Sequence, residues 1–133
     1  MPQTTEWYLE NRIIIAHYSG AVTLADLRGS CQRELELLDA STAQYVDVLV
    51  DITEQTSREG NLMEVRNIFQ SVMAHPKKRW TILFGPAYPQ SYINDVVARS
   101  YRARYRSMDT LTEALDFLKK QDPTLHKLLV NGK

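Results

Sequence analysis

The start of the chain predicts a pair of strands. Apolar Trp7 and Leu9 precede three consecutive isoleucines at residues 13–15, and polar Glu10 and Asn11 separate the two groups. Branched and aromatic side chains suit the pleated surface of a strand, and the polar residues between them suit a turn. An antiparallel hairpin is therefore expected here.

A helical period replaces the strand pattern after Gly20. Apolar residues recur at spacings of three and four between about residues 24 and 39, which predicts the buried face of a helix. These residues are Leu24, Leu27, Cys31, Leu35 and Leu38. Thr23 offers a hydroxyl N-cap, and Asp26 lies three residues later, as in a short-armed capping box. Cys31 is expected to be buried and inert, because a reactive cysteine needs an exposed, electropositive setting and Cys31 lies among leucines with Glu34 and Glu36 nearby.

The centre of the chain contains the stretch best suited to function. An apolar run predicts a buried strand over residues 45–52, with Asp51 near its carboxyl end. Polar residues 53–61 predict a loop, and the pattern of residues 62–73 predicts an amphipathic helix that ends before Pro76. In α/β proteins, ligands and partners usually meet the loops that follow the carboxyl ends of strands. The candidate site residues are therefore Asp51, Thr53, Thr56, Ser57 and Arg58.

The rest of the chain continues the alternation of strands and helices. A strand over residues 80–84 would complete a strand, helix, strand unit, which implies a right-handed parallel crossover. Thr110 and Glu113 predict a capping box at the start of a later helix. The remaining expected elements are a stiff loop at 86–89, a helix at about 93–102, a short strand at 105–107, a helix at 111–118 and a helical turn after Pro123.

Composition indicates the class of molecule. The chain has 133 residues, of which 44% are hydrophobic and 24% are charged, and this balance is typical of one globular domain. Residues 1–133 are expected to form a single domain with a core at about 6–120 and a short tail. The single cysteine excludes an intramolecular disulfide, and no stretch has the length of a membrane span or resembles a signal peptide. The expected location is the cytoplasm.

Charge is unevenly distributed along the chain. The net charge is zero, but residues 1–74 carry a balance of −6 and residues 75–106 a balance of +6. Lys77, Lys78, Arg79 and the arginines at 99–106 lie near Tyr101 and Tyr105, a combination that suggests phosphate contact with base stacking. A pI of about 6.8 argues against a dedicated nucleic-acid binder, so nucleic acid is an unlikely partner.

Catalytic and metal-binding patterns are absent from the sequence. Asp47 and Asp51 lie four residues apart on one strand, too far apart to share a proton. The three histidines, His17, His75 and His126, show no ligand spacing, and no glycine-rich phosphate-binding motif occurs. We therefore expect no catalytic residue, no metal site and no cofactor.

Several segments together resemble a known family. They are Ser19-Gly20-Ala21-Val22-Thr23, Val48-Leu49-Val50-Asp51, Thr81-Ile82-Leu83-Phe84-Gly85 and Met108-Asp109-Thr110-Leu111-Thr112-Glu113-Ala114-Leu115. In this order they look like a STAS domain of the SpoIIAA-like, anti-sigma-factor-antagonist type. The resemblance covers about residues 6–120. It implies a mixed sheet of four to five strands, with about four helices packed largely on one side, in a bacterial regulatory protein that binds other proteins and does not catalyse a reaction.

The resemblance also points to a regulatory hydroxyl. In phosphorylated members, a Ser or Thr in an Asp-Ser-Ser/Thr-Gly motif caps the helix after the central strand, and a kinase modifies it. Ser57 is the nearest equivalent by position, although no Asp precedes it and two residues separate it from Gly60. A phosphate on Ser57 or Thr56 would add about −1.5 to −2 charges beside Arg58. The alternative is that one of these hydroxyls simply caps the helix.

A second interpretation is a small-molecule or lipid-binding domain. Folds of the CRAL-TRIO type resemble the SpoIIAA-like sheet, and some hold apolar ligands behind a mobile helix. The residues that would line such a space here are Phe69, Met73, Trp80, Tyr88 and Tyr92. Ordinary core packing explains the same residues. A protein partner is the first expectation, a small apolar ligand the second, and a homodimer is left open.

Overall fold

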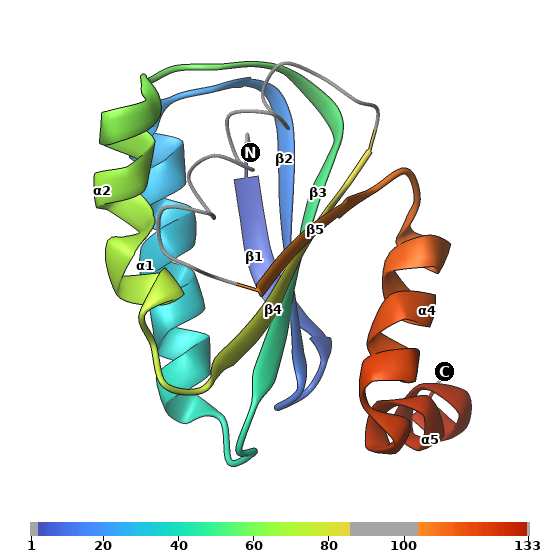
Figure 1. Cartoon of the computed structure of the whole chain (residues 1–133). Helices are drawn as coiled ribbons and strands as arrows, with labels where there is room; N and C mark the ends of the chain where they lie inside the picture. The colour runs from blue at the N-terminus through green and yellow to red at the C-terminus, as the bar shows by residue number, and fades with distance from the viewer. Residues whose placement is uncertain (1–2, 86–103, 133) are drawn as a thin grey trace.

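The computed structural model describes residues 3–85 and 104–132, which form a mixed five-stranded sheet with helices on both faces (Figure 1). The strands, in sheet order, are β1 (Gln3–Leu9), β2 (Ile13–Val22), β3 (Val46–Arg58), β4 (Lys78–Phe84) and β5 (Arg104–Met108). The helices are α1 (Leu24–Ala40), α2 (Leu62–Met73), α4 (Leu111–Gln121) and α5 (Pro123–Gly132). The α/β class and the mixed sheet of four to five strands expected from the sequence are confirmed, and the described sheet has five strands.

The sheet combines one hairpin with parallel pairs. β1 and β2 are antiparallel, as predicted, and Asn11 in their turn has a φ of 68°. β2 pairs in parallel with β3, β3 with β4, and β4 with β5. α1 connects β2 to β3 and α2 connects β3 to β4, because parallel neighbours need a crossover of this length.

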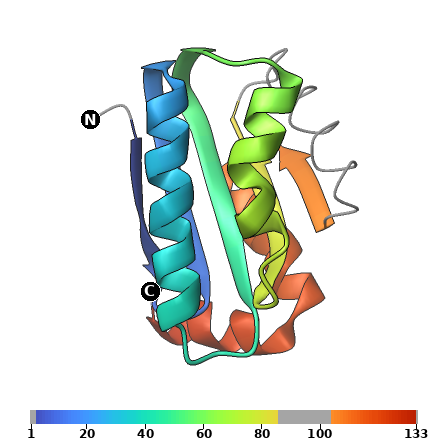
Figure 2. The same ribbon diagram turned by 90° about the vertical axis from the view of Figure 1, so that its left-hand side faces the viewer.

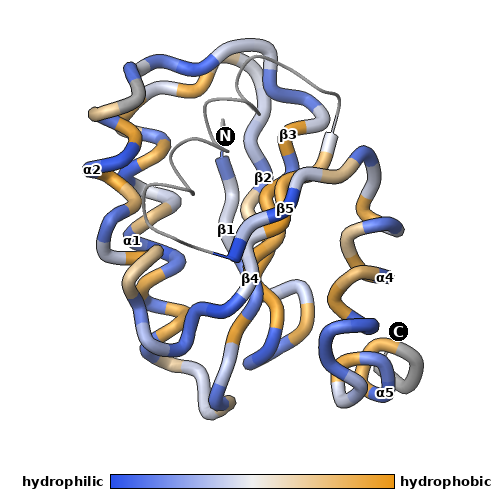
Figure 3. Tube along the Cα trace, in the orientation of Figure 1, coloured by the Kyte–Doolittle hydropathy of each residue, from blue (hydrophilic) through white to orange (hydrophobic). Residues whose placement is uncertain are grey.

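The described helices divide between the two faces of the sheet. α1 and α2 lie side by side on one face (Figure 2), where Ile14, Val48 and Val72 belong to the core. α4 and α5 cover the other face, where Leu49 packs with Leu118. The sequence interpretation placed most helices on one side, and two of the four described helices instead bury an apolar stripe on the other. The apolar central strands lie between these layers (Figure 3).

Local signals predicted the starts of two helices. Thr23 accepts a hydrogen bond from the Asp26 amide at 3.1 Å, and the Asp26 carboxylate accepts one from the Thr23 amide at 2.9 Å, which confirms the predicted capping box of α1. Thr110 accepts from the Glu113 amide at 3.2 Å at the start of α4. Cys31 is buried on the inner face of α1, as expected. The predicted loop at 86–89 and the predicted helix at about 93–102 lie outside the described residues.

Candidate functional site

Residues 53–61, which were expected to form a loop after a strand at 45–52, are mostly strand. β3 extends to Arg58, and Ser57 and Arg58 pair with Ala21 and Val22 of β2. The prediction of a loop over 53–61 was therefore wrong for its first six residues. The long neighbouring strand explains the difference, since β2 supplies the hydrogen-bonding groups that keep a polar stretch extended. The register shifts along this pairing disrupt the alternation of buried and exposed positions that would have signalled a strand.

The cap of α2 is also not the expected residue. Asn61 Oδ1 accepts a hydrogen bond from the Glu64 amide, and Glu64 Oε1 accepts one from the Asn61 amide, both at 2.9 Å. Neither Thr56 nor Ser57 caps the helix. Asn61 and Glu64 have the spacing of a capping box, so the sequence contains the signal, and the hydroxyls of Thr56 and Ser57 are competing N-cap candidates nearby.

Gly60 allows the chain to turn into this cap. Its φ is +106°, and a Cβ atom there would lie 2.6 Å from Leu24 Cδ2. Glu59 ties the turn to the start of α1, because its amide donates to Val22 O at 2.8 Å and its Oε1 accepts from the Leu24 amide at 3.0 Å. The turn is therefore held on both sides by α1 and β2.

Asp51 and Thr53 come together near the middle of the sheet. Asp51 Oδ2 lies 2.8 Å from His17 Nδ1, and Oδ1 accepts a hydrogen bond from the Thr53 amide at 2.9 Å. Burial alone would raise the pKa of Asp51, but hydrogen bonds from Thr53 and His17 outweigh it and hold the pKa below its usual value. Asp51 is thus an ionised carboxylate with partners inside the fold.

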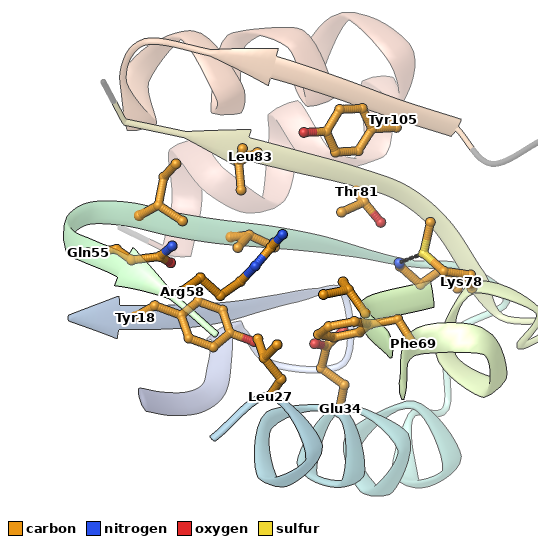
Figure 4. A pocket seen from close by; sticks show the side chains of 14 residues that line it. Tyr18, Leu27, Glu34, Gln55, Arg58, Phe69, Lys78, Thr81, Leu83 and Tyr105 are labelled. Carbon is orange, nitrogen blue, oxygen red and sulfur yellow. Dashed lines mark hydrogen bonds between the residues drawn. The ribbon is translucent and has the colours of Figure 1, made fainter. Parts of the chain in front are cut away.

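The other three candidate residues point in different directions. The side chains of Thr56 and Ser57 are exposed, whereas Arg58 is half-buried and lines a cavity between the sheet and helices α1 and α2 (Figure 4). Burial lowers the pKa of Arg58. The expected grouping of Arg58 with a surface phosphate is therefore not what the fold builds, because the arginine faces inward.

The sequence did not predict this cavity, because its lining residues come from segments that lie far apart in the chain. It has a volume of about 90 Å³ and receives side chains from α1, α2 and four strands of the sheet. Its apolar walls include Leu27, Phe69 and Leu83. Its polar lining is formed by Tyr18, Glu34, Gln55, Arg58, Lys78, Thr81 and Tyr105.

Glu34 is the most unusual residue of the lining. Its side chain is 3% exposed, and its carboxylate makes no hydrogen bond or ion pair within residues 3–85 and 104–132. Burial raises the pKa of Glu34 to about 7, and the charge of Lys78 opposes the shift. Glu34 continues the buried stripe of α1 at three residues from Cys31, so the helical period marks the position, although Glu34 was not among the candidate site residues.

Lys78 faces the same space with a weak partner. Its Nζ donates to the thioether of Met73 at 3.2 Å (Figure 4), and burial lowers its pKa. Sulfur is a poor acceptor, so this contact compensates little of the lost hydration. The hydroxyl of Thr81 is buried and has no hydrogen-bond partner in the part of the chain that the structure describes.

The residues proposed to hold an apolar ligand are only partly brought together. Phe69 and Met73 line the cavity. Trp80 lies on the opposite face of the sheet, where its ring meets Phe117 edge-on with centroids 4.8 Å apart. The expectation that Trp80 lines the same space was therefore wrong, because successive strand residues face opposite sides. Tyr88 and Tyr92 lie outside the described residues.

The basic residues of β4 do not form one surface. Arg79 turns to the α4 side and binds Asp47, while Lys78 lines the cavity on the other side. Arg106 lies over the ring of Trp80, 5.0 Å from its centroid. Splitting the charges between the two faces leaves no continuous phosphate-binding stripe among these residues.

Two further properties concern the part of the chain that the structure describes. It contains no group of three or more histidine, cysteine or acidic side chains placed to hold a metal ion. None of its helices is both long enough and apolar enough to cross a membrane.

Comparisons with known proteins find the fold at low sequence identity. No protein-family model and no curated relative matches the chain. An uncharacterised DUF3478-family protein with a SpoIIAA-like fold from Shewanella loihica PV-4 superposes with a TM-score of 0.62 at 15% identity, covering 87% of this chain and 91% of that one.

Two structures of SpoIIAA show the same likeness. The anti-sigma factor antagonist SpoIIAA in its unphosphorylated form gives a TM-score of 0.57 at 12% identity, covering 88% of this chain and 97% of the other. The Bacillus cell fate determinant SpoIIAA in its phosphorylated form gives 0.59 at 12% identity, covering 87% and 98%. The chain is therefore a domain of the SpoIIAA-like, STAS-type fold that the sequence resemblance predicted.

Proposed function

We propose that this protein is a non-catalytic regulatory domain that binds a protein partner through one surface, made of residues 53–59 and the first turns of α2. The observation that carries the proposal is Met63, which is 60% exposed at the start of α2. Methionine adapts its shape to an apolar partner, and such residues are enriched at the centres of interfaces. Thr56 and Ser57, which are also exposed, precede Met63 in the chain.

The fold supports this function by analogy. One solved neighbour is named an anti-sigma factor antagonist, which acts on another protein, and its structures are named as phosphorylated and unphosphorylated forms. Our proposal treats residues 1–133 as one such domain that acts in the cytoplasm of a bacterium.

We further propose Thr56 or Ser57 as the regulatory modification site. Both hydroxyls are exposed, and a phosphate would add about −1.5 to −2 charges to a surface that already carries Glu54 and Glu59. Because Asn61 caps α2, the phosphate would act by repelling or attracting the partner, and the cap of the helix would stay intact.

The partner surface is tested by a matched pair of variants. Met63→Asp places a charge at the centre of the proposed interface, whereas Leu128→Asp changes another exposed apolar residue, 40% exposed, on α5. The tagged chain is used to recover partners from the native host, with quantitative mass spectrometry as the readout. We expect Met63→Asp to lose the partner at least tenfold and Leu128→Asp to retain it. Equal recovery from both variants would contradict the proposed surface.

The modification site is tested separately on the same preparation. Intact-mass analysis of the chain from its native host is expected to show a phosphorylated fraction that Thr56→Ala or Ser57→Ala removes. Ser57→Asp is then expected to change partner recovery relative to Ser57→Ala. Identical recovery from the wild type and both Ser57 variants, with no phosphorylated fraction in any growth state, would exclude the switch and leave the interface proposal standing.

A further inference from the structure

The cavity between the sheet and helices α1 and α2 has polar walls with too few internal partners. The carboxylate of Glu34 has none within the described chain, the hydroxyl of Thr81 has none there either, and Lys78 has only the Met73 thioether. These side chains come from α1 and β4 and point toward the same space (Figure 4). Three groups, one from α1 and two from β4, therefore face the cavity with hydrogen-bonding capacity to spare.

Such an arrangement costs stability unless something completes it. Burying a polar group without a partner costs about 1–3 kcal/mol, and an unpaired charge costs more. Native proteins therefore rarely leave buried polar side chains unpaired, and each exception calls for a ligand, a water or a functional role. The cavity has room for one, since its volume of about 90 Å³ is several times the space that a single water needs.

The charged side chains that line the cavity indicate the sign of the charge that a ligand would carry. Lys78 and Arg58 contribute two positive groups, and Glu34 is the acidic residue of the lining. When Glu34 is protonated the wall is purely cationic, and the carboxyl group then becomes a hydrogen-bond donor. An anion would accept hydrogen bonds from all three of these side chains, whereas a cation would meet two like charges.

The apolar side chains that line the cavity indicate that the ligand also has an apolar part. Leu27, Phe69 and Leu83 line the same space as the polar groups, so a fully polar anion such as phosphate would leave these apolar side chains against water. A volume of about 90 Å³ admits a molecule of roughly four to six non-hydrogen atoms, well short of a lipid chain.

We propose that this cavity binds a short aliphatic monocarboxylate, with its carboxylate directed at Lys78, Thr81 and the protonated Glu34 and its tail against Leu27 and Phe69. Binding is coupled to a proton, because an ionised Glu34 repels the ligand and a protonated Glu34 donates to it. The site lies beneath the proposed partner surface but does not depend on it.

Among the titratable groups that face the cavity, we assign the coupling to pH to Glu34; burial also lowers the pKa of Lys78, and the Glu34→Gln variant separates the two groups. Tyr18 of β2 and Cys31 of α1 lie near Glu34, and burial raises the pKa of both, so they stay neutral between pH 6 and 8. Lys78 of β4 and Arg58 of β3 carry the positive charges, and Tyr105 of β5 completes the lining. The affinity for the anion should therefore fall above pH 7, where Glu34 loses its proton.

The test uses the full chain labelled with nitrogen-15 and titrated with butyrate. Amide shifts in the cavity lining are expected to saturate, and the dissociation constant is expected to rise above pH 7 with a slope approaching about tenfold per pH unit. Butyramide, which has the same shape without the charge, is the control ligand and is expected to bind at least tenfold more weakly. Equal binding of the two ligands, or shifts that lie elsewhere, would overturn the proposal.

Two variants locate the effect on the wall. Lys78→Met is expected to abolish butyrate binding, and Glu34→Gln is expected to retain binding but lose its dependence on pH, because the amide still donates. Glu36→Gln on the exposed side of α1 and Lys120→Met on α4 are matched controls that should behave as the wild type. If Lys78→Met does not fold, the pH profile of Glu34→Gln decides. A profile that still follows the wild type would refute the site.

Discussion

The two faces of the sheet bury charged side chains in opposite ways. On the α4 side, Asp47 is 0% exposed and accepts hydrogen bonds from Arg79 Nε at 3.0 Å, from the Arg79 terminal nitrogen at 2.8 Å and from the Trp80 amide at 3.0 Å. On the α1 side, Glu34 is almost equally buried and accepts none from the described residues. The two carboxylates are therefore almost equally buried, and they differ in the number of partners that the described residues supply.

The charged cluster on the α4 side, made of Arg12, Asp47, Arg79 and Asp122, connects distant parts of the chain. Arg79 also reaches Asp122 at 3.0 Å, and Asp122 is bound by Arg12 at 3.0 Å, so β3, β4, the β1–β2 turn and the junction of α4 with α5 are connected. Every charge in it has a counter-charge, which leaves nothing for a ligand to complete. On the other face, the polar groups surround a cavity, and their hydrogen-bonding capacity points into it.

The largest expected effect comes from breaking the charged cluster on the α4 side. Asp47→Ala leaves Arg79 half-buried without its main partner, and removal of one member of a buried pair costs about 3–5 kcal/mol in the free energy of unfolding. Urea unfolding followed by circular dichroism measures this loss. Asp116→Ala removes an exposed carboxylate that pairs with Lys119 at 3.3 Å and should change stability by less than about 0.5 kcal/mol. If Asp47→Ala lowers the free energy of unfolding by less than about 1 kcal/mol, the buried charges on the two faces of the sheet would not differ in their dependence on internal partners.

A somewhat smaller change in the free energy of unfolding is expected from Glu34 on the α1 side, and this change depends on pH. The pKa of Glu34 is about 7 in the folded protein against a reference of 4.5, so between these values the folded chain holds a proton that the unfolded chain has lost. Stability from this group is therefore complete below about pH 4.5, is lost as pH rises toward 7, and levels off above it. The total change is about 3 kcal/mol.

Glu34→Gln isolates this contribution. The variant should show a flatter dependence of unfolding free energy on pH than the wild type between about pH 4.5 and 7. Other carboxylates titrate equally in both proteins, so the difference between the two curves reports Glu34. Parallel curves would mean that Glu34 is ionised or solvated in the folded state, and the cavity would lose its distinguishing residue.

The smallest changes in stability are expected near the start of α2, where a hydrogen-bonded cap residue, Asn61, can be compared with an exposed hydroxyl residue, Ser57. Asn61→Ala removes a paired cap and should cost about 1 kcal/mol. Ser57→Ala removes an exposed hydroxyl and should change stability by less than about 0.5 kcal/mol, while it alters modification. Thermal unfolding of the two variants side by side measures both. If Ser57→Ala costs as much as Asn61→Ala, the capping role that the sequence suggested for Ser57 would return.

Local chemistry made parts of this molecule predictable. Thr23 with Asp26, the hairpin at the start of the chain and the buried stripe that contains Cys31 depend on neighbours within a few residues, and all appear as expected. Asn61 with Glu64 was equally local, but the hydroxyls of Thr56 and Ser57 offered a competing cap. Where two local signals compete, the tertiary path of β3 decides between them.

The candidate site was harder to predict because its parts come from distant segments. Asp51 and Thr53 lie two residues apart in β3, whereas Glu34, Arg58 and Lys78 converge only when α1, β3 and β4 are stacked. A register shift between β2 and β3 changes which of their side chains face inward. No spacing along the chain encodes that choice.

The sequence by itself determined the α/β class, the order of the described elements and the helix face that carries Cys31, because hydrophobic periodicity and capping act over short distances. Only the tertiary structure decided that β3 extends through Ser57, that Arg58 points inward and that Glu34 and Lys78 share a cavity. Pairing with β2 and the packing of α1 on the sheet set those outcomes, since the free energy of a polar group depends on which partners the fold places beside it.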